Sequence, residues 1–167
     1  MTIHGPHFRV PFRRRREGRT DYRRRSKLLR STKPRAVVRK TLQQTIVQIV
    51  EAAPAGDAIL AAATSRELIK RGWTGGTGNL PAAYLTGYLA GRRAAAKGIT
   101  EAILDIGLHE PSKGGRLFAA LAGLLDSGIA VPHSPDILPS KDRIRGAHID
   151  AALASAVDAV KAKLEAA

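Results

Sequence analysis

Polar and apolar residues alternate in the first third of the chain in the way that β-strands require. Residues 35–40 and 45–52 are rich in β-branched side chains, with polar residues between apolar neighbours, and an apolar run follows at residues 58–63. The residues at 41–44 would connect the first two segments, and Pro-Ala-Gly-Asp at 54–57 has the composition of a turn. These three segments predict an antiparallel meander.

Beyond residue 63 the apolar spacing becomes helical. A short helix is predicted between Thr64 and Gly72, and Asn79 can cap a longer helix that runs to about residue 97. Gly87 and Gly91 lie four residues apart on this longer helix, so another backbone can approach it closely. We interpret this pair as a site of tight packing between the helix and the sheet.

A further strand and two more helices follow. Residues 102–107 predict a buried strand, and a strand after such a helix is most often the parallel member of a β-α-β crossover. Leucines at helical spacing mark the next helix, which starts after residue 116 and is closed by Gly128. A last helix is predicted to place six apolar residues on one face: Ile149, Leu153, Ala156, Val157, Val160 and Leu164.

The predicted fold class is therefore α/β. It has a mixed sheet, an antiparallel meander plus a parallel strand, packed with helices and preceded by an extended basic N-terminal arm. The predicted domain organisation is a basic N-terminal extension with a short helix at 1–33, an α/β domain at 34–146 and a C-terminal amphipathic helix at 147–167.

Charge is concentrated in the arm. Residues 1–40 contain 15 of the 28 Lys and Arg residues but only two acidic residues, Glu17 and Asp21, a net charge of +13 out of +14 for the whole chain. Such a segment repels itself and cannot bury a core, so we expect it to need a polyanion to become ordered. Nucleic acid is the first candidate, because a sequence pI near 11.1 favours an anionic partner.

Within the arm, residues 1–19 lack periodicity and are predicted to be extended, whereas residues 20–31 predict a short helix. Thr20 can cap this helix, with Asp21 in its first turn. The helical spacing aligns one cationic stripe, formed by Arg19, Arg23, Lys27 and Arg30.

Several function classes are excluded or disfavoured. The sequence has no cysteine, which excludes disulfides, thiolate metal sites and cysteine nucleophiles, and its histidines lack metal-ligand spacing. No apolar run approaches the roughly 18–20 residues of a membrane-spanning helix. His109, near Asp105 at the end of the predicted buried strand, is where an α/β enzyme would keep a site, but a histidine that satisfies a loop carbonyl is the simpler interpretation.

Two glycine-containing loops are candidates for phosphate binding. Residues 75–78 and 112–116 each precede a predicted helix, so their backbone amides could hold a phosphate, although neither matches a nucleotide-binding motif. A phosphate of an RNA backbone fits better than a nucleoside triphosphate, and a plain tight connection remains an equal alternative.

Four blocks of sequence, in order, are familiar: VPFRRRREGRTDY at 10–22, TGNLPAAYLTG at 77–87, AILDIGL at 102–108 and RGAHI at 145–149. They resemble the archaeal branch of the large-subunit ribosomal protein eighteen family. The resemblance implies an α/β domain that binds 5S rRNA in the central protuberance and an extension that threads between RNA helices. The residues that it implies as RNA contacts are Arg13, Arg14, Arg15, Arg16, Arg19, Tyr22, Arg23, Arg24, Lys27, Arg30, Arg35, Arg39, Lys40, Ser112, Lys113, Gly114 and Arg116.

One position departs from this resemblance. The predicted hairpin turn reads Leu42-Gln43-Gln44, where relatives usually carry a positive charge, and this puts a base-specific contact from the turn in doubt.

We therefore expect a structural constituent of the large ribosomal subunit, in the cytoplasm, with no enzymatic activity, cofactor, membrane association or small-molecule substrate. Its expected partners are 5S rRNA, large-subunit rRNA and neighbouring large-subunit ribosomal proteins. The alternatives are a nucleotide-binding α/β enzyme and a sequence-tolerant DNA architectural protein.

Overall fold

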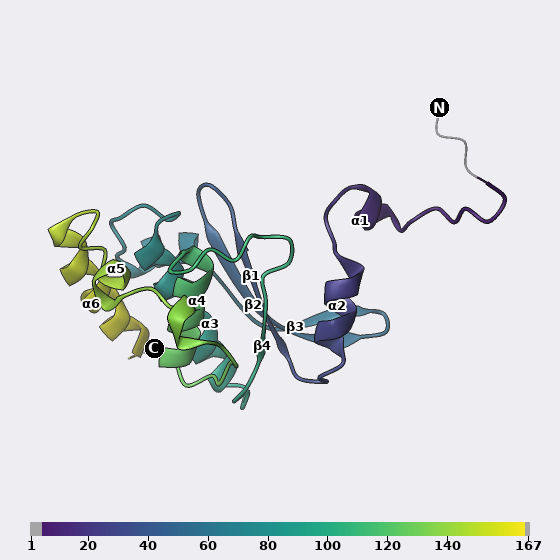
Figure 1. Cartoon of the computed structure of the whole chain (residues 1–167). Coiled ribbons are helices and arrows are strands. Elements are labelled where there is room, and N and C mark those ends of the chain that lie inside the picture. Colours follow the sequence, from purple (N-terminus) through teal and green to yellow (C-terminus); the bar gives the residue numbers. More distant parts are fainter. Residues whose placement is uncertain (1–4, 166–167) are drawn as a thin grey trace.

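A four-stranded mixed sheet lies at the centre of the computed structural model, which describes residues 5–165 (Figure 1). Its strand order is β3-β2-β1-β4, and β2 is antiparallel to both β1 and β3, whereas β4 is parallel to β1. The predicted meander and the predicted parallel strand are both confirmed. The strands are β1 (Arg35–Lys40), β2 (Thr45–Ala53), β3 (Gly56–Thr64) and β4 (Ile103–Asp105).

β4 is shorter and less buried than the sequence pattern predicts. It lies at the edge of the sheet and pairs with β1 alone, so Ile103 and Leu104 are only half-buried, while Asp105 is buried. The chain then leaves the sheet in a loop in which Gly107 has a positive φ of 61°. The apolar run at 102–107 thus combines a short strand with the start of a loop.

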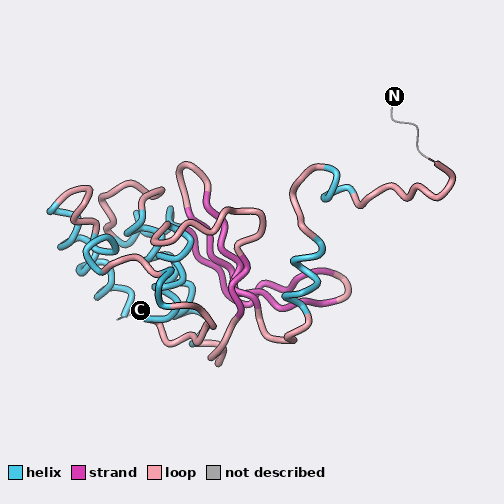
Figure 2. Tube along the Cα trace, viewed as in Figure 1, coloured by secondary structure: helices cyan, strands magenta, loops and turns pink. Residues whose placement is uncertain are grey.

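The two faces of the sheet are covered differently. Ala36 and Val38 of β1 are fully buried, and helices α3 (Leu80–Ala95) and α4 (Arg116–Asp126) pack on the same side of the sheet. Because side chains alternate along a strand, Arg35, Val37 and Arg39 point to the opposite face. Figures 1 and 2 show the helices of the domain on one side of the strands and α2 (Tyr22–Leu29) on the other.

The close approach predicted at Gly87 and Gly91 occurs between two helices, and our interpretation as helix–sheet packing was wrong. A Cβ at Gly87 would overlap with the backbone of Ala120 on α4, and one at Gly91 would overlap with the side chain of Ser127. The contact is reciprocal, because a Cβ at Gly123 of α4 would overlap with the backbone of α3. The spacing predicts a close contact but does not identify the partner.

The C-terminal part of the chain packs on α3. Helix α5 (Lys141–Arg145) and helix α6 (Ala151–Glu165) both contact α3, and Val157, Val160 and Leu164 are buried as predicted. Ile149 was expected on the same face, but it precedes α6 and is half-exposed. Lys161 lies over the rings of Tyr84 and Tyr88, at 5.7 and 5.3 Å from their centroids, which adds a cation–π contact between α6 and α3.

Short elements connect these parts. The 3₁₀ helix η1 (Ser65–Arg71) begins with a capping box formed by Thr64 and Glu67 and ends at Gly72, so the predicted short helix is confirmed. A second 3₁₀ turn, η2 (Pro135–Ile137), precedes α5. The N-terminal arm contains one helical turn, α1 (Arg13–Arg16), where the sequence predicts extended chain.

Candidate nucleic-acid interface

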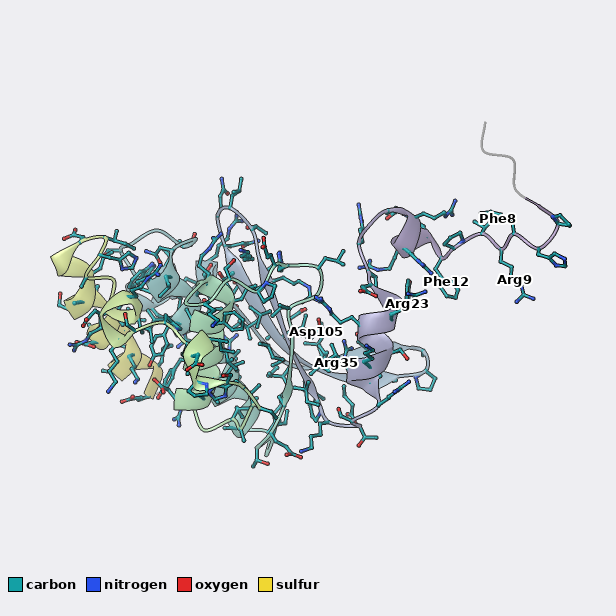
Figure 3. The ribbon with its side chains drawn as sticks, viewed as in Figure 1. Phe8, Arg9, Phe12, Arg23, Arg35 and Asp105 are labelled. Carbon is teal, nitrogen blue, oxygen red and sulfur yellow. The ribbon has the colours of Figure 1, made fainter. Side chains whose placement is uncertain are left out.

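The arm leads away from the domain as an exposed cationic segment (Figure 3). All four arginines of α1 are exposed, and Figure 3 shows Phe8, Arg9 and Phe12 beyond the domain. Glu17 accepts from Arg13 Nε at 2.7 Å and lies 3.3 Å from Arg19 Nε, and Arg14 Nε donates to Thr20 Oγ1 at 2.9 Å. Local contacts thus shape the turn between α1 and α2.

Helix α2 is capped by Asp21 and not by Thr20 as predicted. The Asp21 carboxylate accepts from the backbone N–H groups of Arg23 and Arg24, at 2.9 and 3.1 Å. These hydrogen bonds, led by that from Arg24, hold the pKa of Asp21 below its ordinary value. The residues of the predicted cationic stripe are all exposed: Arg19 just before the helix, Arg23 and Lys27 on it and Arg30 at its C-terminal cap.

The other side of α2 is attached to the domain. Arg24 Nη1 donates to the carbonyl oxygen of Gly107 at 2.6 Å. The two Nη groups of Arg25 donate to the two carboxylate oxygens of Asp57, at 2.7 and 3.0 Å. The hydrogen bond from Arg25 is the main cause that lowers the pKa of Asp57, so this carboxylate is ionised at neutral pH. Helix α2 therefore contacts the domain directly through Arg24 and Arg25.

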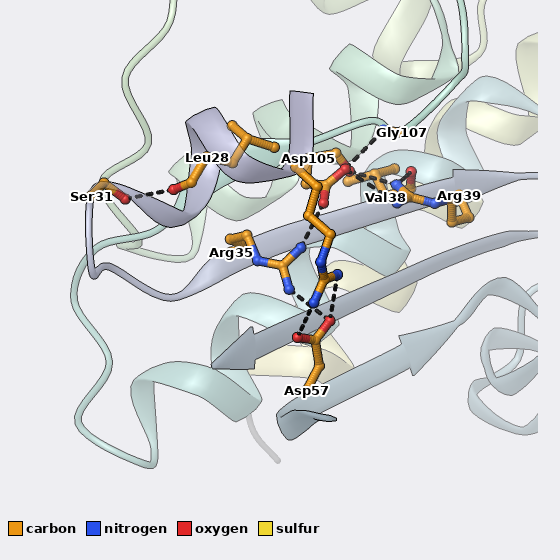
Figure 4. Close-up of polar contacts among 9 residues, drawn as sticks. Leu28, Ser31, Arg35, Val38, Arg39, Asp57, Asp105 and Gly107 are labelled. Carbon is orange, nitrogen blue, oxygen red and sulfur yellow. Dashed lines mark hydrogen bonds and ion pairs between the residues drawn. The ribbon is translucent and has the colours of Figure 1, made fainter. Parts of the chain in front are cut away.

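Beneath α2, a chain of alternating charges crosses the sheet (Figure 4). Arg35 is only 2% exposed, and it donates to Asp57 at 2.6 Å and to Asp105 at 2.8 Å. Arg39 also pairs with Asp105, at 3.1 Å, and donates to the carbonyl oxygens of Val38 and Asp105. A guanidinium buried between two carboxylates cannot reach an RNA phosphate, so Arg35 differs from the role that the resemblance implied for it.

The remaining predicted contacts lie on the β1–β2 hairpin, at Lys40, and in the segment 112–116 that leads into α4. Arg116 Nη1 donates to the carbonyl oxygens of Thr41 and Gly78, at 3.0 and 2.7 Å, so part of its hydrogen-bonding capacity is used within the chain. Lys40 is half-buried, whereas Ser112 and Lys113 are exposed. Arg116 thus resembles Arg24 and Arg39. Each of the three arginines donates hydrogen bonds within the chain and also exposes part of its side chain to solvent.

Neither glycine loop presents a phosphate cradle of the kind considered from the sequence. A Cβ at Gly78 would overlap with the carbonyl oxygen of Leu42, and Thr77 Oγ1 donates to the Gln43 carbonyl at 2.6 Å. The first loop thus packs against the hairpin turn. In the second loop, the amides of Gly114 and Gly115 donate to carbonyl oxygens of the chain itself, at 2.9 and 3.1 Å. The alternative of tight connections describes both loops better.

The two residues considered for an enzyme, His109 and Asp105, are both engaged in hydrogen bonds within the domain. His109 Nε2 accepts from the backbone N–H of Lys40 at 3.2 Å, and burial, followed by nearby Arg39, Lys40 and Arg116, lowers the pKa of His109. Asp105 is occupied by two arginines and by the amide of Gly107 at 2.8 Å. Among the described residues, no group of histidines and carboxylates could hold a metal ion.

Comparison with known proteins decides the family. The model described as "Ribosomal large subunit proteins 60S L5, and 50S L18" matches residues 6–101 and 96–134. The chain belongs to this family. "Large ribosomal subunit protein uL18" of Korarchaeum cryptofilum is 61% identical over 142 residues, 85% of this chain and 73% of the relative. The protein of the same name from Aeropyrum pernix is 58% identical over 146 residues, 87% of this chain and 68% of the relative.

Membership of the L5/L18 family confirms the resemblance and the structural, non-enzymatic role in the large ribosomal subunit. It implies ribosomal RNA and ribosomal proteins as partners. Within the part of the chain that the structure describes, no helix is both long and apolar enough to cross a membrane.

The sequence analysis missed two kinds of residue at this interface. Arg25 and Asp57 attach α2 to the sheet, and no local pattern connects them, because they are 32 positions apart. Phe12 lies in the resembling block but was not among the predicted contacts, although this residue is 72% exposed. Its position directly before four arginines was the sequence feature that could have marked Phe12 as a candidate contact.

Proposed function

We propose that this member of the L5/L18 family binds 5S rRNA and helps to attach it to the large-subunit rRNA in the central protuberance, in cytoplasmic ribosomes. The observation that carries the proposal is the separation of charge from fold: the exposed arginines of α1 and α2 extend from a domain whose own charges are largely balanced. Because phosphate contacts position a protein without reading sequence, the arm would supply affinity and the domain would fix orientation.

The proposed phosphate contacts are the exposed cations of the arm, with Lys40 and the 112–114 segment as further candidates on the domain. Arginine suits this role because its planar guanidinium forms forked contacts with phosphate oxygens. Arg35 is not included, because its guanidinium is buried. The proposed contacts of the arm are Arg13, Arg14, Arg15, Arg16, Arg19, Arg23, Arg24, Lys27 and Arg30.

The test is filter binding of a 5S rRNA transcript over a series of salt concentrations. The slope of log K against log salt is roughly −0.9 per neutralised phosphate for a duplex and roughly −0.7 for a single strand. Replacing Arg13, Arg14, Arg15 and Arg16 together by Ala should weaken binding and reduce the slope by about three units. These side chains are exposed and lie outside the core, so the unfolding midpoint should not change.

A matched control removes the same number of exposed cations from η1, α3, α5 and α6: Lys70, Arg92, Lys141 and Lys163, each replaced by Ala. This variant should keep the affinity and the slope of the wild type. An equal effect of both variants would mean that total charge, and not the arm, governs binding. Competition by duplex DNA at equal salt tests the DNA-binding alternative, which predicts equal affinities for the two nucleic acids.

A further inference from the structure

A pair of aromatic rings lies within the arginine-rich arm. The rings of Phe12 and Tyr22 are 5.1 Å apart between centroids and are inclined at 51°. Phe12 is 72% exposed and Tyr22 is half-buried. The contact between the two rings stabilises the arm by only about 0.5–1.5 kcal/mol in addition to the area that it buries. Most of the apolar surface of Phe12 therefore remains in solvent.

The turn between α1 and α2 brings these two rings together through contacts within the arm. Gly18 has a φ of 64°, and the amides of Gly18 and Arg19 donate to the carbonyl oxygens of Arg15 and Arg14, at 3.1 and 2.9 Å. This turn folds the chain back, so that rings ten residues apart in the sequence meet. The anchoring of α2 to the domain by Arg25 then fixes Tyr22 relative to the sheet.

Tyr22 also borders a hollow of about 400 Å³, whose walls include Arg15, Gly18, Arg23 and Leu108. Leu108 comes from the loop after β4 and is 54% exposed, so the domain adds an apolar wall to a site that the arm begins. The hollow thus combines an aromatic ring, an aliphatic side chain and the guanidinium groups of Arg15 and Arg23. Thr20 and Asp21 complete its walls, and the Asp21 carboxylate accepts hydrogen bonds from the backbone amides at the start of α2.

We propose that the Phe12–Tyr22 pair and the adjoining hollow receive an unpaired nucleobase of the bound RNA. Unstacked bases bind to aromatic rings and arginine planes, and phosphates on either side would meet Arg15 and Arg23. An acidic protein partner would pair with the arginines but would leave the rings unused. The inference rests on the proposed RNA-binding function and adds to it one class of ligand, a nucleotide outside a helix.

The experiment compares two synthetic RNA hairpins that differ only by one unpaired nucleotide in the stem, with the full chain as the protein. The wild type should bind the hairpin with the unpaired nucleotide about 5- to 150-fold more tightly, the range that stacking of one base supplies. Phe12→Ala should abolish this preference without changing the salt slope, because no charge is removed. Phe12→Trp should retain the preference, and Phe12→Leu, which keeps bulk but lacks a ring, should lose it.

Arg15→Ala is the contrasting variant. It should weaken binding to both hairpins and reduce the salt slope by about 0.7–0.9. Equal binding of the two hairpins by the wild type, or a preference that survives in Phe12→Ala, would overturn the inference and leave the proposed function intact. Failure of the wild type to bind 5S rRNA in dilute salt would overturn the proposed function, and the inference with it.

Discussion

At the scale of single residues, Arg35 shows that a basic side chain in a nucleic-acid-binding protein can serve the fold alone. It points to the face of the sheet that α2 covers, between Asp57 and Asp105. Removing a charge from water costs several kcal/mol, and the paired carboxylates offset that cost only while both remain in place. The pair with Asp105 is the more buried one, since the Asp105 side chain is 8% exposed and that of Asp57 is 27% exposed.

Asp105→Asn should therefore be strongly destabilising. The substitution keeps the shape of the side chain but leaves Arg35 with a buried charge that only Asp57 balances, and loss of one partner of a buried pair costs about 3–5 kcal/mol. Urea unfolding followed by circular dichroism measures the change in free energy of unfolding.

The control for this prediction is Asp158→Asn. Asp158 pairs with Arg145 at 2.6 Å, but both side chains are more than half-exposed, so this pair should contribute about 0–1 kcal/mol. If Asp105→Asn destabilised the protein no more than Asp158→Asn does, the charge chain beneath α2 would not contribute to stability.

At the scale of elements, the arm consists of two parts with different physical properties. An eight-residue helix is marginal in water, and α2 is stabilised by its cap at Asp21 and by the pairing of Arg25 with Asp57. The α1 segment, in contrast, is held by contacts within the arm. These contacts place the basic residues of α2 in one orientation relative to the sheet, and any such orientation held before binding reduces the ordering cost.

The packing of α3 on α4 gives a second prediction. Gly87→Ala should destabilise the fold by about 2 kcal/mol or more, because its Cβ would meet the backbone of Ala120 and the helices would have to separate. Gly91→Ala should cost less than Gly87→Ala. Its Cβ would meet a side chain instead of a backbone: the Ser127 hydroxyl can rotate away, at the loss of its hydrogen bond to the Leu124 carbonyl, but Ser127 Cβ at 2.8 Å still requires a small shift of α4, which the higher helix propensity of alanine offsets in part.

Thermal and urea unfolding of the two variants provide the measurement, and each variant serves as the control of the other because the substitution is the same. Equal losses at the two positions would mean that the distance between the helices adjusts freely, and that neither glycine sets it.

At the scale of the whole molecule, the sequence was informative wherever a local pattern determines the structure. The meander, the capping residue Asn79 and the close-packing glycines all follow from short-range rules, and each is found in the structure. The burial of Arg35 could not be predicted, because its partners Asp57 and Asp105 are 22 and 70 positions away. For the interface, the sequence predicted the basic arm but not which of its arginines are used to attach it.

The division of charge between arm and domain leads to a final prediction, for a variant that begins at residue 34. It retains a net charge of only +4 and every residue of the sheet and of α3–α6, so it should fold, with a modest loss of stability because Arg25 no longer pairs with Asp57. Its affinity for 5S rRNA should fall by at least about 100-fold in dilute salt, because the arm supplies most of the cations that release counterions.

Circular dichroism measures whether this variant folds, and filter binding measures its affinity for 5S rRNA. A folded fragment that binds 5S rRNA as tightly as the full chain would place the affinity in the domain, at Lys40 and the 112–114 segment. A fragment that fails to fold would instead show that α2 is an integral layer of the domain. The charge chain through Arg35 makes a folded, weakly binding fragment the expected result, because Arg35 keeps both of its carboxylate partners without α2.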